Sequence, residues 1–94
     1  MKWLEIIELR SVGSNRELVE SQLQKLINEV EKEAKKQAIN VYSRITIDTD
    51  FRIHLFHDSK MVKNKKSPLG LCLASALKAF GLVNHSIWIE MRSK

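Results

Sequence analysis

Histidine is the residue type in this chain best suited to proton transfer or metal binding, and there are three: His54, His57 and His85. His54 and His57 are three residues apart in a segment that alternates like a strand, so their side chains should point to opposite faces of a sheet. His57 ends this strand, whereas His85 begins a later strand that we expect to run parallel to it, which places the two at opposite ends. Because zinc needs three or four ligands around one point, we expect no metal site and no cofactor.

A lysine-rich segment leads directly into an expected helix and is a candidate anion-binding site. Free amides and the positive end of the helix dipole favour anions at such a position. The segment has no phosphate-loop spacing, and a solvated loop remains the higher-ranked interpretation. The candidate residues are Lys63, Lys65, Lys66, Ser67 and Gly70.

Cysteine and paired aspartates have structural explanations. Cys72 falls among leucine and alanine neighbours in the first turns of an expected helix, which indicates a buried apolar residue rather than a reactive thiol. Asp48 and Asp50 flank Thr49 at the tip of an expected hairpin, where turn formation explains both carboxylates. A single cysteine excludes an internal disulfide and fits a reducing compartment, so we expect a cytoplasmic protein.

Six elements in the order β-α-β-β-α-β must position these residues. The first helix should begin at a capping box formed by Ser14 and Glu17. The second should begin at Ser67 and Pro68, and should end at Gly81 in a left-handed cap. The expected bounds are 2–10, about 15–37, 41–48, 51–58, 68–80 and 82–92.

Apolar spacing predicts which side of each helix is buried. The second helix is nearly apolar all round, since Ser75 is the only polar side chain between Leu69 and Leu77. Such a helix is normally buried on every side, so we expect a further surface to cover it. The first helix carries a single buried stripe, made of Val19, Leu23, Leu26, Ile27, Val30 and Ala34.

Length and composition indicate one globular domain over residues 1–94. Apolar residues make up 44% and charged residues 29%, which is ordinary for a folded protein. No apolar run approaches the roughly 18 residues of a membrane span. The net charge of +5 permits an anionic partner. A chain of this size gains stability from oligomerisation.

The element order predicts an α+β, ferredoxin-like fold. Its four-stranded antiparallel sheet has the order 4-1-3-2, and two helices cover one face. The opposite face is open and, by strand parity, carries a mixed aromatic and basic set that indicates a dimer interface or a ligand face. This set is Trp3, Tyr42, Arg44, Arg52, His54, Phe56 and Trp88.

In topology and patterning, nearly the whole chain resembles the dimeric α+β barrel proteins. These are ferredoxin-like chains of about this length that pack two sheets face to face. The resemblance implies a homodimer. Some members are cofactor-independent monooxygenases or haem enzymes, but no catalytic residue carries over to this chain.

Three functions follow from this reading. We expect a homodimeric binding or regulatory module that packs through its open sheet face. The alternative is a protein that binds a small molecule, such as a small anionic ligand, or a cofactor-independent enzyme of the dimeric α+β barrel type. Binding of single-stranded nucleic acid on the same face ranks third, because the third strand lacks the basic-glycine-aromatic pattern of the RNA-recognition motif.

Overall fold

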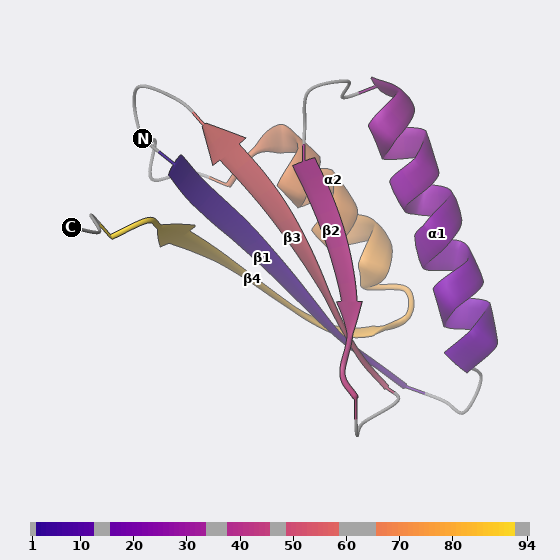
Figure 1. The fold of residues 1–94 in the computed structure, drawn as a ribbon. Coiled ribbons are helices and arrows are strands. Elements are labelled where there is room, and N and C mark those ends of the chain that lie inside the picture. Colours follow the sequence, from indigo (N-terminus) through magenta and orange to yellow (C-terminus); the bar gives the residue numbers. More distant parts are fainter. Residues whose placement is uncertain (1, 13–15, 34–37, 46–48, 59–65, 92–94) are drawn as a thin grey trace.

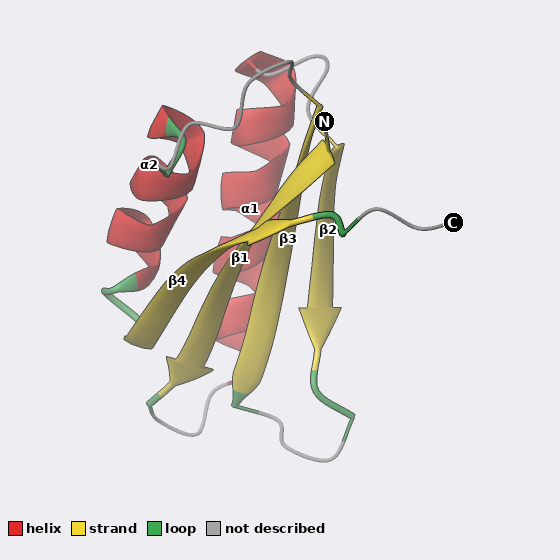
Figure 2. Ribbon diagram, turned by 90° about the vertical axis from the view of Figure 1, so that its left-hand side faces the viewer, coloured by secondary structure: helices red, strands yellow, loops and turns green. Residues whose placement is uncertain are grey.

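The fold is an antiparallel sheet covered on one face by two helices (Figures 1 and 2). A computed structural model describes residues 2–12, 16–33, 38–45, 49–58 and 66–91. The sheet order is β2-β3-β1-β4, and every neighbouring pair is antiparallel, so the expected fold class is confirmed. The elements are β1 (Lys2–Ser11), α1 (Arg16–Glu33), β2 (Ala38–Ser43), β3 (Asp50–Asp58), α2 (Pro68–Leu77) and β4 (Gly81–Ile89).

The core lies between the sheet and the helices. Strand residues alternate between the two faces, and the odd-numbered residues of β1 and β3 point toward the helices. Full burial of one large aliphatic side chain contributes about 1.5–3 kcal/mol, so these contacts dominate the stability of the domain. The core residues are Ile7, Leu9, Val19, Leu23, Ile27, Phe51, Ile53, Leu55, Leu73, Ala74 and Leu77.

The apolar stripe of α1 is confirmed where the structure describes it. Val19, Leu23 and Ile27 are buried, and Leu26 packs partly against the same core. The predicted capping residue Ser14 and the predicted end of the helix lie outside the described residues. Among those residues, no helix is both long enough and apolar enough to cross a membrane.

The start of α2 is confirmed and its predicted end is wrong. The Ser67 side chain accepts a hydrogen bond from the amide of Gly70 at 2.9 Å, as expected of an N-cap. The helix ends at Leu77, and Gly81 belongs to β4, opposite Ser11. A Cβ on Gly81 would lie 2.1 Å from the carbonyl oxygen of Arg10, so close approach to β1 requires glycine there.

The chain covers α2 on one side only. Gly70, Leu73, Ala74 and Leu77 are the buried residues of α2, and they lie on the side that packs against the sheet. Leu71 is 52% exposed and Cys72 is also exposed. The expectation that Cys72 is buried is therefore wrong for this chain, because its side chain points away from the sheet.

The second strand starts and ends earlier than predicted. Its last pair in the ladder is Ser43 with Phe51. The Arg44 amide still donates to the Asp50 carbonyl at 3.0 Å, but Ile45 is almost fully exposed. The strand predicted over residues 41–48 therefore does not extend beyond Ser43 in the described residues.

Candidate functional site

A fully buried carboxylate, Glu5, lies on the helix-covered face of the central strand β1. Its Oε1 accepts a hydrogen bond from Nε2 of His57 at 2.7 Å, and its Oε2 accepts one from Nε2 of His85 at 2.6 Å. The backbone amide of Ser67 also donates to Oε2, at 3.2 Å. A buried carboxylate is tolerated only when hydrogen-bonded, and these three donors meet that requirement.

The strand register explains how two distant histidines reach one carboxylate. Trp3 of β1 is opposite His57 of β3, and Ile7 of β1 is opposite His85 of β4. Glu5 lies between these two rows on the same face. Diagonal neighbours in a sheet are within reach of long and aromatic side chains, so both imidazoles can approach Glu5 from the flanking strands.

The prediction that His57 and His85 lie at opposite ends of the sheet is therefore wrong. His85 is in the middle of β4, which begins at Gly81, rather than at its start. The His57 backbone lies opposite Trp3 and the His85 backbone lies opposite Ile7, each two residues from Glu5 along β1. The two side chains therefore reach Glu5 from opposite directions. Glu5 shares the strand parity of the buried Ile7, but Ile6 and Ile7 are both apolar, so the sequence alone does not show on which face Glu5 lies.

The N-terminus of α2 closes the cluster from the helix side. Ser67 contributes its amide, and Gly70 packs directly on the carboxylate. A Cβ on Gly70 would lie 2.1 Å from Oε2 of Glu5, so any side chain there would displace it. The described part of the candidate anion site therefore already contacts an internal carboxylate. Lys66 is exposed, and the two remaining candidates lie outside the described residues, namely Lys63 and Lys65.

Trp3 belongs to this buried side and not to the open face. Its ring stacks on the His57 ring, with centroids 3.9 Å apart and planes 17° apart. Its strand parity is that of Glu5 and Ile7. The predicted position of Trp3 on the open face is therefore wrong. A charged residue at position 5 suggests that odd-numbered residues of β1 face solvent, but His57 and His85 hydrogen-bond to Glu5 and allow it to be buried.

The hydrogen bonds define what the cluster can do chemically. An ionised Glu5 needs a proton on Nε2 of each histidine, so it fixes the orientation of both rings. Carboxylate–histidine pairs do this in catalytic sites, but here the side chains of His57 and His85 are only 12% and 5% exposed. Among the described residues, no group of three or more His, Cys, Asp or Glu side chains could hold a metal ion. The cluster therefore connects β1, β3, β4 and α2.

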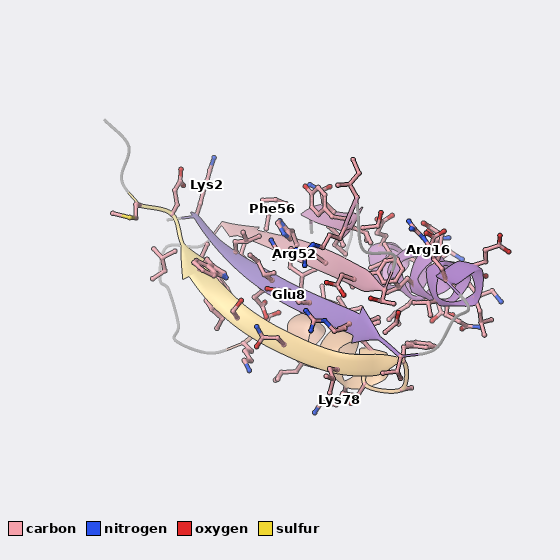
Figure 3. All side chains as sticks on the ribbon, turned by 90° about the horizontal axis from the view of Figure 1, so that it is seen from below. Lys2, Glu8, Arg16, Arg52, Phe56 and Lys78 are labelled. Atoms are coloured by element: carbon pink, nitrogen blue, oxygen red, sulfur yellow. The ribbon has the colours of Figure 1, made fainter. Side chains whose placement is uncertain are left out.

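The open face carries the other six predicted residues of the aromatic and basic set. In one row, Leu4 of β1 lies between Phe56 of β3 and Trp88 of β4. Phe56 is 41% exposed and Trp88 is 57% exposed. Figure 3 shows Phe56 and Arg52 along this face, away from the helices. We call this surface the open face; its predicted residues are Tyr42, Arg44, Arg52, His54, Phe56 and Trp88.

Ion pairs cross the end of the open face that lies away from Trp88. Arg52 pairs with Glu8 at 3.5 Å. Asp50 pairs with Arg10 at 3.4 Å and with Arg44 at 3.3 Å. Desolvation opposes ionisation of Asp50, but hydrogen bonds from Arg44 and its neighbour Thr49, with the positive charges nearby, hold its pKa below the ordinary value.

His54 is the unusual polar residue of the open face. Its Nε2 atom is buried and is the one buried side-chain nitrogen or oxygen without a hydrogen-bond partner in the described part of the chain. Its ring lies 4.7 Å from that of Tyr42 and 6.1 Å from that of Phe56. Desolvation lowers the pKa of His54, the charge of Arg52 lowers it further, and Glu8 opposes this effect.

A partly open pocket of about 720 Å³ lies beside these residues, and we call it the groove. Its lining includes the charged end of the open face together with His54 and Tyr42. Its volume is in the range of roughly 300–1,000 Å³ typical of small-ligand sites.

Comparison of the chain with models of protein families, with curated proteins and with solved structures found no match.

Proposed function

We propose that this protein is a binding module that self-associates through its open face. The observation that carries the proposal is the row formed by Phe56, Leu4 and Trp88, in which two large aromatic side chains remain half exposed on either side of an aliphatic one. Tyr42 of β2, 46% exposed, continues this surface through the His54 ring, which contacts both Tyr42 and Phe56. Contiguous exposed apolar surface of this kind marks an interaction site.

A second copy of the chain is a suitable partner for this surface. The open face carries both signs of charge, at Glu8 and Asp50 and at Arg10, Arg44 and Arg52. A two-fold dimer places the same surface of each copy against the other. Because the open face carries both positive and negative charges, residues of opposite charge can meet across such an interface. Two such sheets pack about 10 Å apart.

The size of the face fits a dimer. Four strands about 4.8 Å apart and about 20–30 Å long present roughly 400–600 Å² in projection, and side-chain relief adds accessible area. A standard interface buries about 800 Å² on each partner. Burial of the exposed part of Trp88 and Phe56 contributes about 1 kcal/mol or more for each side chain.

Light scattering at micromolar concentration tests the proposal. The parent chain should have twice the mass of a monomer, and Trp88→Glu should reduce it to a monomer. Leu71→Glu is the matched control, since Leu71 is similarly exposed, at 52% against 57% for Trp88, but lies on the outer side of α2. A parent that is monomeric, or a dimer that survives Trp88→Glu, overturns the proposal.

The groove favours a second function, the binding of a small anionic ligand. Three arginines face two carboxylates there, which leaves one positive charge in excess. Inorganic phosphate should then raise the melting temperature of the parent chain, and Arg52→Gln should reduce the effect. A monomer that instead binds single-stranded oligonucleotides with strong salt dependence would favour the nucleic-acid function.

A further inference from the structure

The buried Nε2 atom of His54 lacks a hydrogen-bond partner within the described residues. This nitrogen has almost no accessible surface in the single chain, so a proton placed on it, as a charged imidazole requires, would be buried without an acceptor. His54 lies near the middle of the open face, between Ile6 of β1 and Asn40 of β2 in the strand register. A second copy packed on this face would cover the part of the ring that remains exposed.

The surroundings of His54 favour its neutral form. On its own strand, Arg52 and Phe56 flank it at two residues' distance. On β1 the neighbours are Ile6 and Glu8, and Glu8 is already paired with Arg52. On β2 the neighbours are Asn40 and the Tyr42 ring.

No carboxylate on these three strands is therefore dedicated to a charged His54. The nearest one, Glu8, is shared with the Arg52 guanidinium, which itself repels an imidazolium. The helices pack against the other face of the sheet and contribute no group here. Covering the open face would remove the water that solvates a charged ring.

We infer that His54 makes self-association depend on pH: the open face packs on a second copy when the ring is neutral, whereas a protonated ring disfavours this contact. This inference rests on the proposed self-association through the open face. A charged imidazole under the partner sheet would be desolvated and held beside Arg52, and both effects disfavour it.

The direction of the pH dependence follows from linkage. The dimer favours the neutral ring, so association is strongest above the pKa of His54 in the monomer and weakens as the pH falls below it. That pKa is lowered from the ordinary histidine value of 6.5 in the single chain, so the weakening begins below pH 6.5. Each dimer contains two such rings, and the dissociation constant should therefore rise by up to about 100-fold for each pH unit below that pKa.

Sedimentation equilibrium of the full chain at pH 7.5 and pH 5.0 tests the inference, with circular dichroism at both pH values to verify folding. The parent should be dimeric at pH 7.5 and dissociate at pH 5.0. His54→Gln keeps a hydrogen-bonding side chain without titrating, so its dissociation constant should be equal at the two pH values. If the His54→Gln variant is dimeric at pH 7.5 and dissociates at pH 5.0, as the parent is expected to do, the role of His54 is overturned.

Nuclear magnetic resonance titration of the His54 ring in the parent gives a second readout that needs no substitution. The pKa should be lower in a concentrated, dimeric sample than in a dilute one, and equal values overturn the inference. A parent that is equally dimeric at both pH values overturns the inference and leaves the proposed function standing. A folded parent that is monomeric at both pH values overturns the proposed function itself.

Discussion

Glu5 and His85 lie on neighbouring strands and form a hydrogen bond of 2.6 Å inside the domain, between Oε2 and Nε2. Both side chains are almost removed from solvent. Their backbones are two residues out of register, so the contact depends on both side chains leaning toward each other. His57 does the same from the opposite strand, and the carboxylate is held between the two rings.

Glu5→Gln should lower the free energy of unfolding by about 1.5–3 kcal/mol. The amide keeps the shape of the side chain, but it loses the charge and turns one acceptor oxygen into a donor that faces a histidine nitrogen or the Ser67 amide. Urea denaturation measures the change. Glu8→Gln is the matched control on the same strand, and its partly exposed ion pair with Arg52 should contribute only about 0–1 kcal/mol. Equal losses in the two variants would contradict a special role for the buried carboxylate.

Gly70→Ala should destabilise the protein by about 1–3 kcal/mol, although alanine normally stabilises a helix relative to glycine. The added Cβ would lie 2.1 Å from Oε2 of Glu5 and 3.0 Å from Cε1 of His85, so the cluster must shift. Thermal and urea denaturation measure the effect. Ser75→Ala tests the ordinary helix preference at an exposed position of α2 and should be neutral or stabilising. A gain in stability from Gly70→Ala would show that the cluster moves at no cost.

Local sequence features predicted most of the fold. The start of α2 depends on the Ser67 side chain, which caps the helix, and on the Pro68 ring, which fixes the backbone at the first helical position. Both effects are confined to the first turn of the helix. The alternation of β3 and the stripe of α1 are likewise properties of short segments. These features, with the element order, are sufficient to predict the sheet order.

The polar cluster could not be predicted because it depends on register between distant strands. In β1, Ile6 and Ile7 are both buried, on opposite faces, so apolar content does not decide the parity of the strand. The usual rule that a glutamate faces solvent then selects the wrong face for Glu5 and Trp3. Only the pairing of β1 with both β3 and β4 shows that two histidines satisfy the carboxylate.

Exhaustive treatment with a chelator should leave the melting temperature unchanged. In the described residues the imidazoles of His57 and His85 hydrogen-bond directly to Glu5, so the cluster is complete without an ion. Differential scanning calorimetry before and after dialysis against the chelator measures this. A fall of many degrees that zinc reverses would instead show that metal binding contributes to folding. In that case Glu5→Gln should abolish the effect of zinc.

Asp50→Asn should destabilise the protein at neutral pH by an amount that disappears in acid. The folded protein lowers the pKa of Asp50 below its ordinary value of 3.8 through its contacts with Arg44, Thr49 and Arg10. A carboxylate with a lowered pKa stabilises the folded state above the unfolded-state pKa, and this contribution is lost as the pH falls through the folded-state pKa. The stability of the parent and the variant should therefore differ at pH 7 and converge below pH 3.8.

Urea denaturation of Asp50→Asn and of the parent at a series of pH values measures the difference. Glu29→Gln, which replaces an exposed carboxylate on α1, should show little effect at any of these pH values. A difference between the parent and Asp50→Asn that stays constant into acid would mean that the loss arises from packing or turn geometry rather than from the charge of Asp50.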